Sequence, residues 1–141
     1  MSARPVVISI PPAIQVERIL YATDFSRASE RALPIVSAIA RHYGSQVHIA
    51  HIWSSKPYPI PDLGTPITFK EETQARGKMA DLLIQPELQN LRTVVELEQG
   101  DPVDRIANYV QTHAISLVVL GTHGRTRVVH ALMGSVAEEL F

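Results

Sequence analysis

The sequence predicts an α/β protein with a doubly wound, open parallel sheet between two layers of helices, a three-layer α/β/α fold. Short apolar segments rich in branched residues, typical of buried strands, alternate with segments whose apolar residues recur every three or four positions, typical of helices. This alternation predicts parallel strands joined by right-handed crossovers, with helices on both faces. A glycine-rich loop follows the last predicted strand, at the sheet edge where such folds bind ligands.

The chain has 141 residues, which favours one domain, assigned here to residues 16–141. Residues 1–15 are predicted to form an N-terminal arm or an added edge strand. The apolar stretch Val6–Ile10 is too short to span a bilayer, and no small-residue cleavage site follows it. We therefore expect no targeting role for this segment.

The first strand is predicted at Arg18–Ala22, and a helix follows it. Ser26 is a suitable N-cap, and apolar residues then recur at helical spacing until Gly44 ends the run. Pro34 lies within this helix, where it removes a backbone hydrogen bond. The sequence therefore predicts a bend near Arg31 or a late helix start.

The second strand is predicted at Gln46–Trp53. His48 and His51 lie three positions apart in it, which places them on opposite faces of the sheet. Residues 54–66 contain four prolines and a glycine, a composition that predicts a surface loop.

Residues 68–91 are helical in character, with Pro86 marking a kink or a break. The third strand is predicted at residues 93–98, where apolar and polar residues alternate. A helix over residues 103–112 follows, with Asp101 as its N-cap and a proline next to it at the favoured first helical position.

The fourth strand, residues 115–120, is predicted to be fully buried and leads into the pattern G-x2-G-x9-G-S, which comprises Gly121, Gly124, Gly134 and Ser135. Glycine lets an anion approach the backbone closely, and free N–H groups at a helix start favour phosphate oxygens. In a doubly wound sheet the ends of strands one and four flank the crevice where the strand order reverses. We therefore expect Thr23-Asp24 and the glycine loop to face one pocket.

Charge and cysteine content exclude several classes of function. The 13 basic and 14 acidic residues give a net charge of −1 and form no block, so neither nucleic acid nor a membrane is an expected partner. Cysteine is absent, which excludes disulfides and thiol chemistry and favours a cytoplasmic setting.

Two motifs together resemble those of the universal stress protein family. The first is Tyr21-Ala22-Thr23-Asp24-Phe25-Ser26, close to the family's P-T-D-F-S. The second is Gly121-Thr122-His123-Gly124, followed nine residues later by Gly134-Ser135. The resemblance covers residues 17–141 and includes Ala50-His51-Ile52 and the turn Gly100-Asp101-Pro102.

The resemblance implies an ATP-binding regulatory or stress-response module, a homodimer that binds ATP or another adenine nucleotide with Mg²⁺. Asp24 and Ile52 would contact the adenine and ribose end, and the glycine loop would lie along the ribose and phosphates. If ATP binds, Arg125 or Arg127 would supply positive charge to the phosphates. The predicted binding residues are Ala22, Thr23, Asp24, Ile52, Leu120, Gly121, His123, Gly124, Arg125, Gly134, Ser135 and Val136.

The sequence departs from the family pattern at two places. Ala22 stands where the family often has proline. Family members also continue the last helix and add a fifth strand, whereas this sequence ends at Phe141, so we expect that strand to be absent. Val6–Ile10 is a candidate to lie against the edge left open, from the same chain or from a partner.

Each predicted binding residue also has a purely structural interpretation. Ser135 and Glu138 form a capping box, which stabilises a helix start without a ligand. Asp24 can equally cap the first helix or accept a hydrogen bond from the Ser26 amide. Gly121 and Gly124 can be turn glycines. These alternatives stay open at the level of sequence.

Catalytic and metal motifs are missing from the sequence. The six histidines show no metal-ligand spacing, and there is no G-x4-G-K-[ST] phosphate loop or G-x-S-x-G elbow. No catalytic residue and no protein-held metal are predicted. The leading interpretation is an ATP-binding module, the alternative is a nucleotide-free structural or interaction dimer of the same fold, and a nucleotide-hydrolysing enzyme ranks third.

Overall fold

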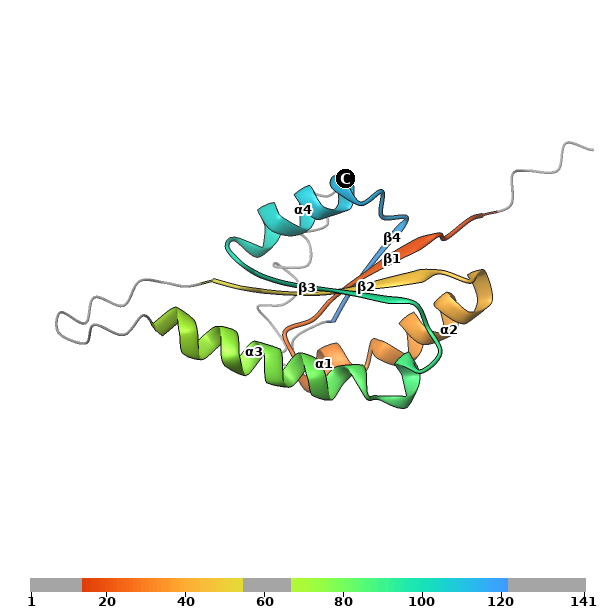
Figure 1. Ribbon diagram of the computed structural model, residues 1–141. Coiled ribbons are helices and arrows are strands. Elements are labelled where there is room, and N and C mark those ends of the chain that lie inside the picture. The colour runs from red at the N-terminus through yellow and green to blue at the C-terminus, as the bar shows by residue number, and fades with distance from the viewer. Residues whose placement is uncertain (1–13, 55–66, 122–141) are drawn as a thin grey trace, which may run out of the picture.

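The computed structural model describes residues 14–54 and 67–121, and these form a parallel sheet flanked by helices (Figure 1). The sheet order is β3-β2-β1-β4. All three pairings are parallel, which confirms the predicted doubly wound α/β fold. The strands are β1 (Arg18–Ala22), β2 (Gln46–Trp53), β3 (Thr93–Gln99) and β4 (Leu117–Leu120).

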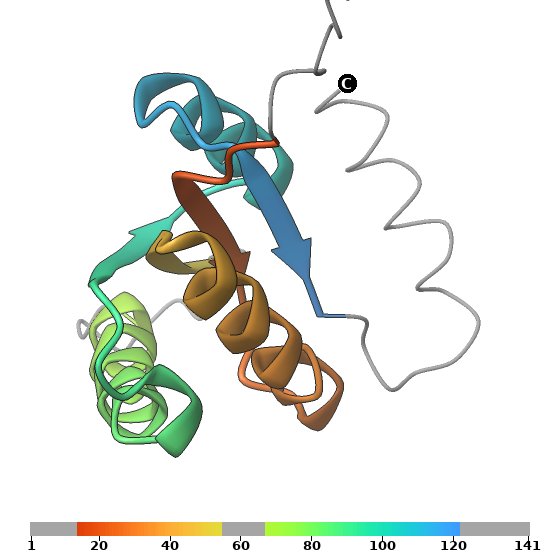
Figure 2. The same ribbon diagram turned by 90° about the vertical axis from the view of Figure 1, so that its right-hand side faces the viewer.

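Helices cover both faces of this sheet. Figure 1 shows α4 on one face and α1, α2 and α3 on the other, so the three layers of the prediction are present. Figure 2 shows β4 beside β1 at the edge of the sheet. The helices are α1 (Arg27–Glu30), α2 (Leu33–Tyr43), α3 (Ile67–Leu83) and α4 (Pro102–Thr112), with a 3₁₀ turn, η1 (Pro86–Leu88).

Pro34 explains why the first helical segment is divided into α1 and α2. It lies in the first turn of α2, where a missing N–H leaves no hydrogen bond broken. The helical run begins at Arg27 and is interrupted at residues 31 and 32, which matches the predicted bend near Arg31 rather than a late helix start. Gly44 ends α2 at φ 66°, in the left-handed region that glycine adopts without a steric penalty.

Two apolar clusters fill the space between the sheet and its helices. The larger lies on the α1–α3 face and centres on Ile19, Tyr21, Val47 and Ile49, each 0% exposed. The smaller lies on the α4 face. Adjacent residues of β1 and β2 alternate between the clusters, as the two-residue period of a strand requires.

The smaller cluster is formed by the buried residues Leu20, Ala50, Ile106 and Tyr109, with partly buried apolar neighbours packed against them.

Two sequence-based predictions need correction. Strand β4 was expected to be fully buried, but its residues are half-buried, because β4 has one paired neighbour and lies at the edge of the described sheet. The break predicted at Pro86 is confirmed, but the helical segment predicted over residues 68–91 is shorter than expected: α3 ends at Leu83, and the chain then makes the short turn η1 at Pro86. Proline at the start of that turn prevents the helix from continuing.

Some predicted segments lie outside the described residues. These are the Val6–Ile10 stretch, all but the first residue of the loop predicted over residues 54–66, and the part of the glycine motif after Gly121. Within the described part of the chain, no helix is long and apolar enough to cross a bilayer.

Candidate functional site

The carboxyl ends of β1 and β4 meet at the point where the strand order reverses. The two strands pair directly, with Ala22 opposite Leu120. Thr23-Asp24 therefore leaves the sheet beside Gly121, although about a hundred residues separate them in the sequence. This juxtaposition of the two loops follows the sequence-based expectation.

Three predicted binding residues form the apolar part of this edge. Ala22, Ile52 and Leu120 are all half-buried and pack against the cluster on the α4 face. They come from three neighbouring strands, because β1 lies between β2 and β4. The structure thus places these three residues in one half-covered apolar cluster at the end of the sheet.

Thr23 and Asp24 form a hydrogen-bonded turn beside the apolar residues. The Thr23 amide donates to the Ala50 carbonyl at 2.9 Å, which extends the pairing of β1 with β2 by one residue. Thr23 is buried, and its hydroxyl accepts from the Phe25 amide at 3.0 Å. Asp24 is exposed, and its Oδ1 accepts from the Ser26 amide at 2.9 Å. One structural role proposed for Asp24, the hydrogen bond with Ser26, is therefore present.

The start of α1 is capped as predicted. The Ser26 hydroxyl accepts from the Ser29 amide at 3.1 Å. Phe25, just before the cap, has φ 63°, a conformation that is uncommon for a bulky residue. The hydrogen bonds of its neighbours on both sides hold this turn in place.

Packing requires glycine at position 121, in addition to the place of Gly121 in the glycine motif. A Cβ atom built on Gly121 would lie 2.1 Å from Ser29 Cα and 2.7 Å from Ser29 Oγ. No other residue type fits at that separation without movement of the backbone. The glycine loop thus leaves β4 in direct contact with α1.

His51 supports the first loop from β2. Its Nδ1–H donates to the Thr23 carbonyl at 2.8 Å, and its ring lies 4.4 Å from the ring of Phe25, measured between centroids. His48 lies on the other face, where its Nδ1 is 2.6 Å from the Tyr109 hydroxyl on α4. The prediction that the two histidines point to opposite faces is confirmed.

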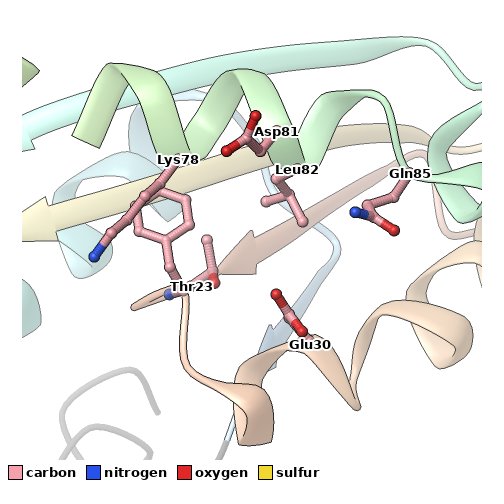
Figure 3. Close-up of a pocket in the computed structure, with 7 residues that line it drawn as sticks. Thr23, Glu30, Lys78, Asp81, Leu82 and Gln85 are labelled. Carbon is pink, nitrogen blue, oxygen red and sulfur yellow. Dashed lines mark hydrogen bonds between the residues drawn. The ribbon is translucent and has the colours of Figure 1, made fainter. Parts of the chain in front are cut away.

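A cavity of about 170 Å³ lies behind the Thr23 turn, on the α3 side of the sheet. Figure 3 shows Lys78, Asp81 and Leu82 of α3 across this space from Thr23 and Glu30. Of the predicted binding residues that the structure describes, only Thr23 lines it. This cavity and the apolar edge residues therefore lie on different sides of the sheet.

Half of the predicted binding residues belong to the segment after Gly121. His123, Gly124, Arg125, Gly134, Ser135 and Val136 lie outside the described residues.

The sequence did not predict the contacts that Ser29 and His51 make with the loops in this region. Ser29 stands on the buried side of a four-residue helix, and its neighbours in the sequence give no sign of its contacts. His51 was named within Ala50-His51-Ile52 and weighed as a metal ligand or catalytic group, but no structural contact was predicted for it. Its position near the carboxyl end of β2 was the available signal, because that end lies beside the loop after β1. Among the described residues, no group of three metal-ligating side chains occurs.

Burial shifts the ionisation of both strand histidines in the same direction. Burial lowers the pKa of His48, and His113 and Arg18 lower it further. Burial also lowers the pKa of His51, although the hydrogen bond to Thr23 and the charge of Asp24 oppose that shift. Burial raises the pKa of the Tyr21 hydroxyl, which the hydroxyls of Ser29 and Thr23 partly offset.

These shifts predict acid destabilisation. Folding lowers the pKa of each histidine, so each takes up a proton more readily in the unfolded chain. Each histidine therefore contributes stability above about pH 6.5, its pKa in the unfolded chain, and this contribution is lost as the pH falls below that value. The expected slope is at most about 1.4 kcal/mol per pH unit for each proton. Urea unfolding between pH 7 and pH 5 measures it.

Histidine variants separate the contribution of His48 and His51 to this pH dependence from that of the other titrating groups. The double variant His48→Gln, His51→Gln should show a flatter fall in unfolding free energy between pH 6.5 and pH 5. His42→Gln, at an exposed position on α2, should retain the wild-type slope. Equal slopes for all three proteins would contradict the assignment.

The fold and the paired loops define a doubly wound α/β protein with a candidate ligand edge at its switch point. A sequence model described as "Universal stress protein family" matches residues 15–141. The chain therefore belongs to the universal stress protein family.

Individual relatives agree with this assignment. Universal stress protein MJ0577 of Methanocaldococcus jannaschii is 24% identical over 147 residues, covering 91% of this chain and 90% of that protein. A solved structure of MJ0577 has a TM-score of 0.74. The structure of UspA from Lactobacillus plantarum has a TM-score of 0.72 at 23% identity, covering 89% of this chain and 93% of UspA.

A third relative was solved with a ligand. This universal stress protein, described as a complex with cAMP, has a TM-score of 0.55 at 20% identity and covers 90% of this chain and 89% of its own. At these identities the solved structures support the fold.

Proposed function

We propose that this protein is an adenine-nucleotide-binding regulatory module of the universal stress protein family, acting as a homodimer with ATP and Mg²⁺ as its ligand. The observation that carries the proposal is the meeting of the two motif loops at the switch point, with Ala22 opposite Leu120. Ligands of open α/β sheets bind at this edge.

The described residues suit the base and ribose end of such a nucleotide. Ala22, Ile52 and Leu120 offer a half-covered apolar surface, which suits a planar base. Asp24 is exposed beside it and supplies a carboxylate that can accept hydrogen bonds from ribose hydroxyls or a base amino group. Gly121 begins the loop whose sequence predicts the phosphate contacts. Mg²⁺ would be held mainly by phosphate oxygens and water.

The cAMP complex of a family member supports the class of ligand. Both cAMP and ATP present an adenine, a ribose and an anionic phosphate, and the motif loops of this chain carry residue types suited to each part. The proposal extends this chemistry to ATP in the present protein.

Titration calorimetry of the purified protein with MgATP tests the proposal. Saturable binding with one nucleotide per chain is the expected result. No heat of binding at millimolar MgATP would overturn the proposal, and rapid ATP turnover in the same sample would indicate an enzyme instead.

Shortening Ile52 should weaken binding in a graded way. Ile52→Ala removes apolar contact area at the base end, and a loss of about 1 kcal/mol corresponds to roughly fivefold weaker MgATP binding. Ile84→Ala is the matched control, because Ile84 is 73% exposed and lies outside both apolar clusters. Calorimetry should give wild-type affinity for that control. Equal affinities for both variants would remove Ile52 from the site.

The nucleotide-free interaction dimer remains the second candidate. It is favoured by a specific observation: Asp24 and Gly121 both have structural contacts that need no ligand. Under that alternative the protein is dimeric by sedimentation and gives no calorimetric response to MgATP.

A further inference from the structure

We infer that Ser29 is a positioning residue that sets the relative placement of the two loops flanking the nucleotide site. This inference rests on the proposed function and adds a residue that belongs to neither motif. It follows from the contacts that Ser29 makes with β1, with the loop after β1 and with Gly121.

Two hydroxyl groups, those of Tyr21 and Thr23, contact Ser29 from the β1 side. Ser29 is 1% exposed, and its hydroxyl donates to the Thr23 hydroxyl at 2.7 Å. The Tyr21 hydroxyl donates to the Ser29 carbonyl at 2.6 Å and also lies 3.3 Å from the Ser29 hydroxyl. The Thr23 hydroxyl also accepts from the Phe25 amide. The Thr23 hydroxyl therefore links Ser29 to the turn before α1 by hydrogen bonds.

The other side of Ser29 contacts the glycine loop. A Cβ on Gly121 would fall 2.1 Å from Ser29 Cα, so the two backbones touch with no room for a side chain between them. Gly121 is the first residue after β4, so this contact fixes where the second loop leaves the sheet. One small residue thus abuts both loops.

The residue type at position 29 fits both contacts. A larger side chain in place of serine would enter the space that the Gly121 backbone occupies, and alanine would remove one of the two donors to the Thr23 hydroxyl and leave only the Phe25 amide. A buried polar group that loses its partner destabilises the arrangement around it. Serine meets both demands, since its hydroxyl reaches Thr23 within the volume available.

The first arm of the test measures the free protein by amide hydrogen exchange. Ser29→Ala should raise the exchange rate of the Phe25 amide about fivefold, because the Thr23 hydroxyl that accepts from this amide loses its anchor. Ser37→Ala is the matched control: Ser37 is a buried serine on α2 whose hydroxyl accepts from Arg41 Nε. It should leave Phe25 exchange unchanged.

The second arm measures MgATP affinity by calorimetry. Ser29→Ala should bind about five- to tenfold more weakly, with no change for Ser37→Ala. Thr23→Val should weaken binding at least as much as Ser29→Ala, because it also removes the acceptor of the Phe25 amide, and Thr23→Ser, which keeps the hydroxyl, should retain near wild-type affinity. The double variant Ser29→Ala, Thr23→Val should bind no more weakly than Thr23→Val alone, since Thr23→Val already removes the contact between the two hydroxyls.

The outcomes separate this inference from the proposed function. If the wild-type protein does not bind MgATP, the proposed function fails, and unchanged Phe25 exchange in Ser29→Ala would overturn the positioning role independently. If the wild-type protein binds but Ser29→Ala matches Ser37→Ala in both affinity and exchange, the positioning role is wrong while the proposed function stands.

Discussion

Gly121→Ala should lower the free energy of unfolding by about 3 kcal/mol, the upper part of the range for overpacked sites. The added methyl group would lie 2.1 Å from Ser29 Cα, closer than any pair of carbon atoms without a bond between them can approach. Since the obstacle is backbone, α1 or β4 must move to admit it. Urea unfolding at pH 7.5 measures the change.

Gly77→Ala is the control for the loss of a glycine as such. Gly77 lies in α3, and a Cβ there would meet nothing within 4 Å. Alanine should therefore stabilise the protein by about 0.5–1 kcal/mol through helix propensity. A wild-type unfolding midpoint for Gly121→Ala would show that β4 and α1 separate freely, and the packing role of Gly121 would be wrong.

Gly121 illustrates what a sequence motif can and cannot indicate. Its position after an apolar strand predicted a loop at the switch point, and the pairing of β1 with β4 places it there. The contact with Ser29 was not foreseeable, because the two residues are 92 positions apart and neither carries a pattern that points to the other. A motif glycine can therefore be required by packing and by a ligand at once.

Local signals predicted the elements well where one residue type dictates the backbone. Pro34 predicted the break between α1 and α2, Gly44 the end of α2, and Asp101 the N-cap of α4, where its carboxylate accepts from the Asp104 amide at 3.1 Å. Each of these effects acts within one helical turn. Sequence alone is sufficient for such cases.

Burial was harder to predict, because it depends on which strands are neighbours. The branched residues of β4 have the composition of a central strand, yet β4 lies at the edge of the described sheet and stays half-buried. The network of Tyr21, Thr23 and Ser29 depends in the same way on how α1 packs over β1. Composition carries no information on such packing partners.

Asp24 is the residue whose replacement should weaken nucleotide binding most among those described. In the proposed site its carboxylate accepts hydrogen bonds at the ribose and base end, and hydrogen bonds to a charged group contribute about 1.5–3 kcal/mol. Asp24→Ala should therefore weaken MgATP binding by roughly 10- to 100-fold by calorimetry. The same substitution removes the acceptor for the Ser26 amide, so α1 should also lose some stability.

Asp24→Asn separates these two consequences. Asparagine keeps an oxygen that can accept from the Ser26 amide, so the turn and the unfolding free energy should stay close to wild type, whereas the charge that strengthens the ligand contact is lost. Affinities for MgATP and for adenosine should fall by the same factor in this variant, because the proposed contact does not involve the phosphates. A fall in affinity confined to MgATP would place Asp24 at the phosphate end. Wild-type affinity for both ligands would mean that Asp24 has only its structural role in the turn. The residue's structural role, visible in the hydrogen bond to Ser26, thus does not compete with the proposed binding role: the turn that this bond stabilises is what holds the carboxylate at the edge of the sheet.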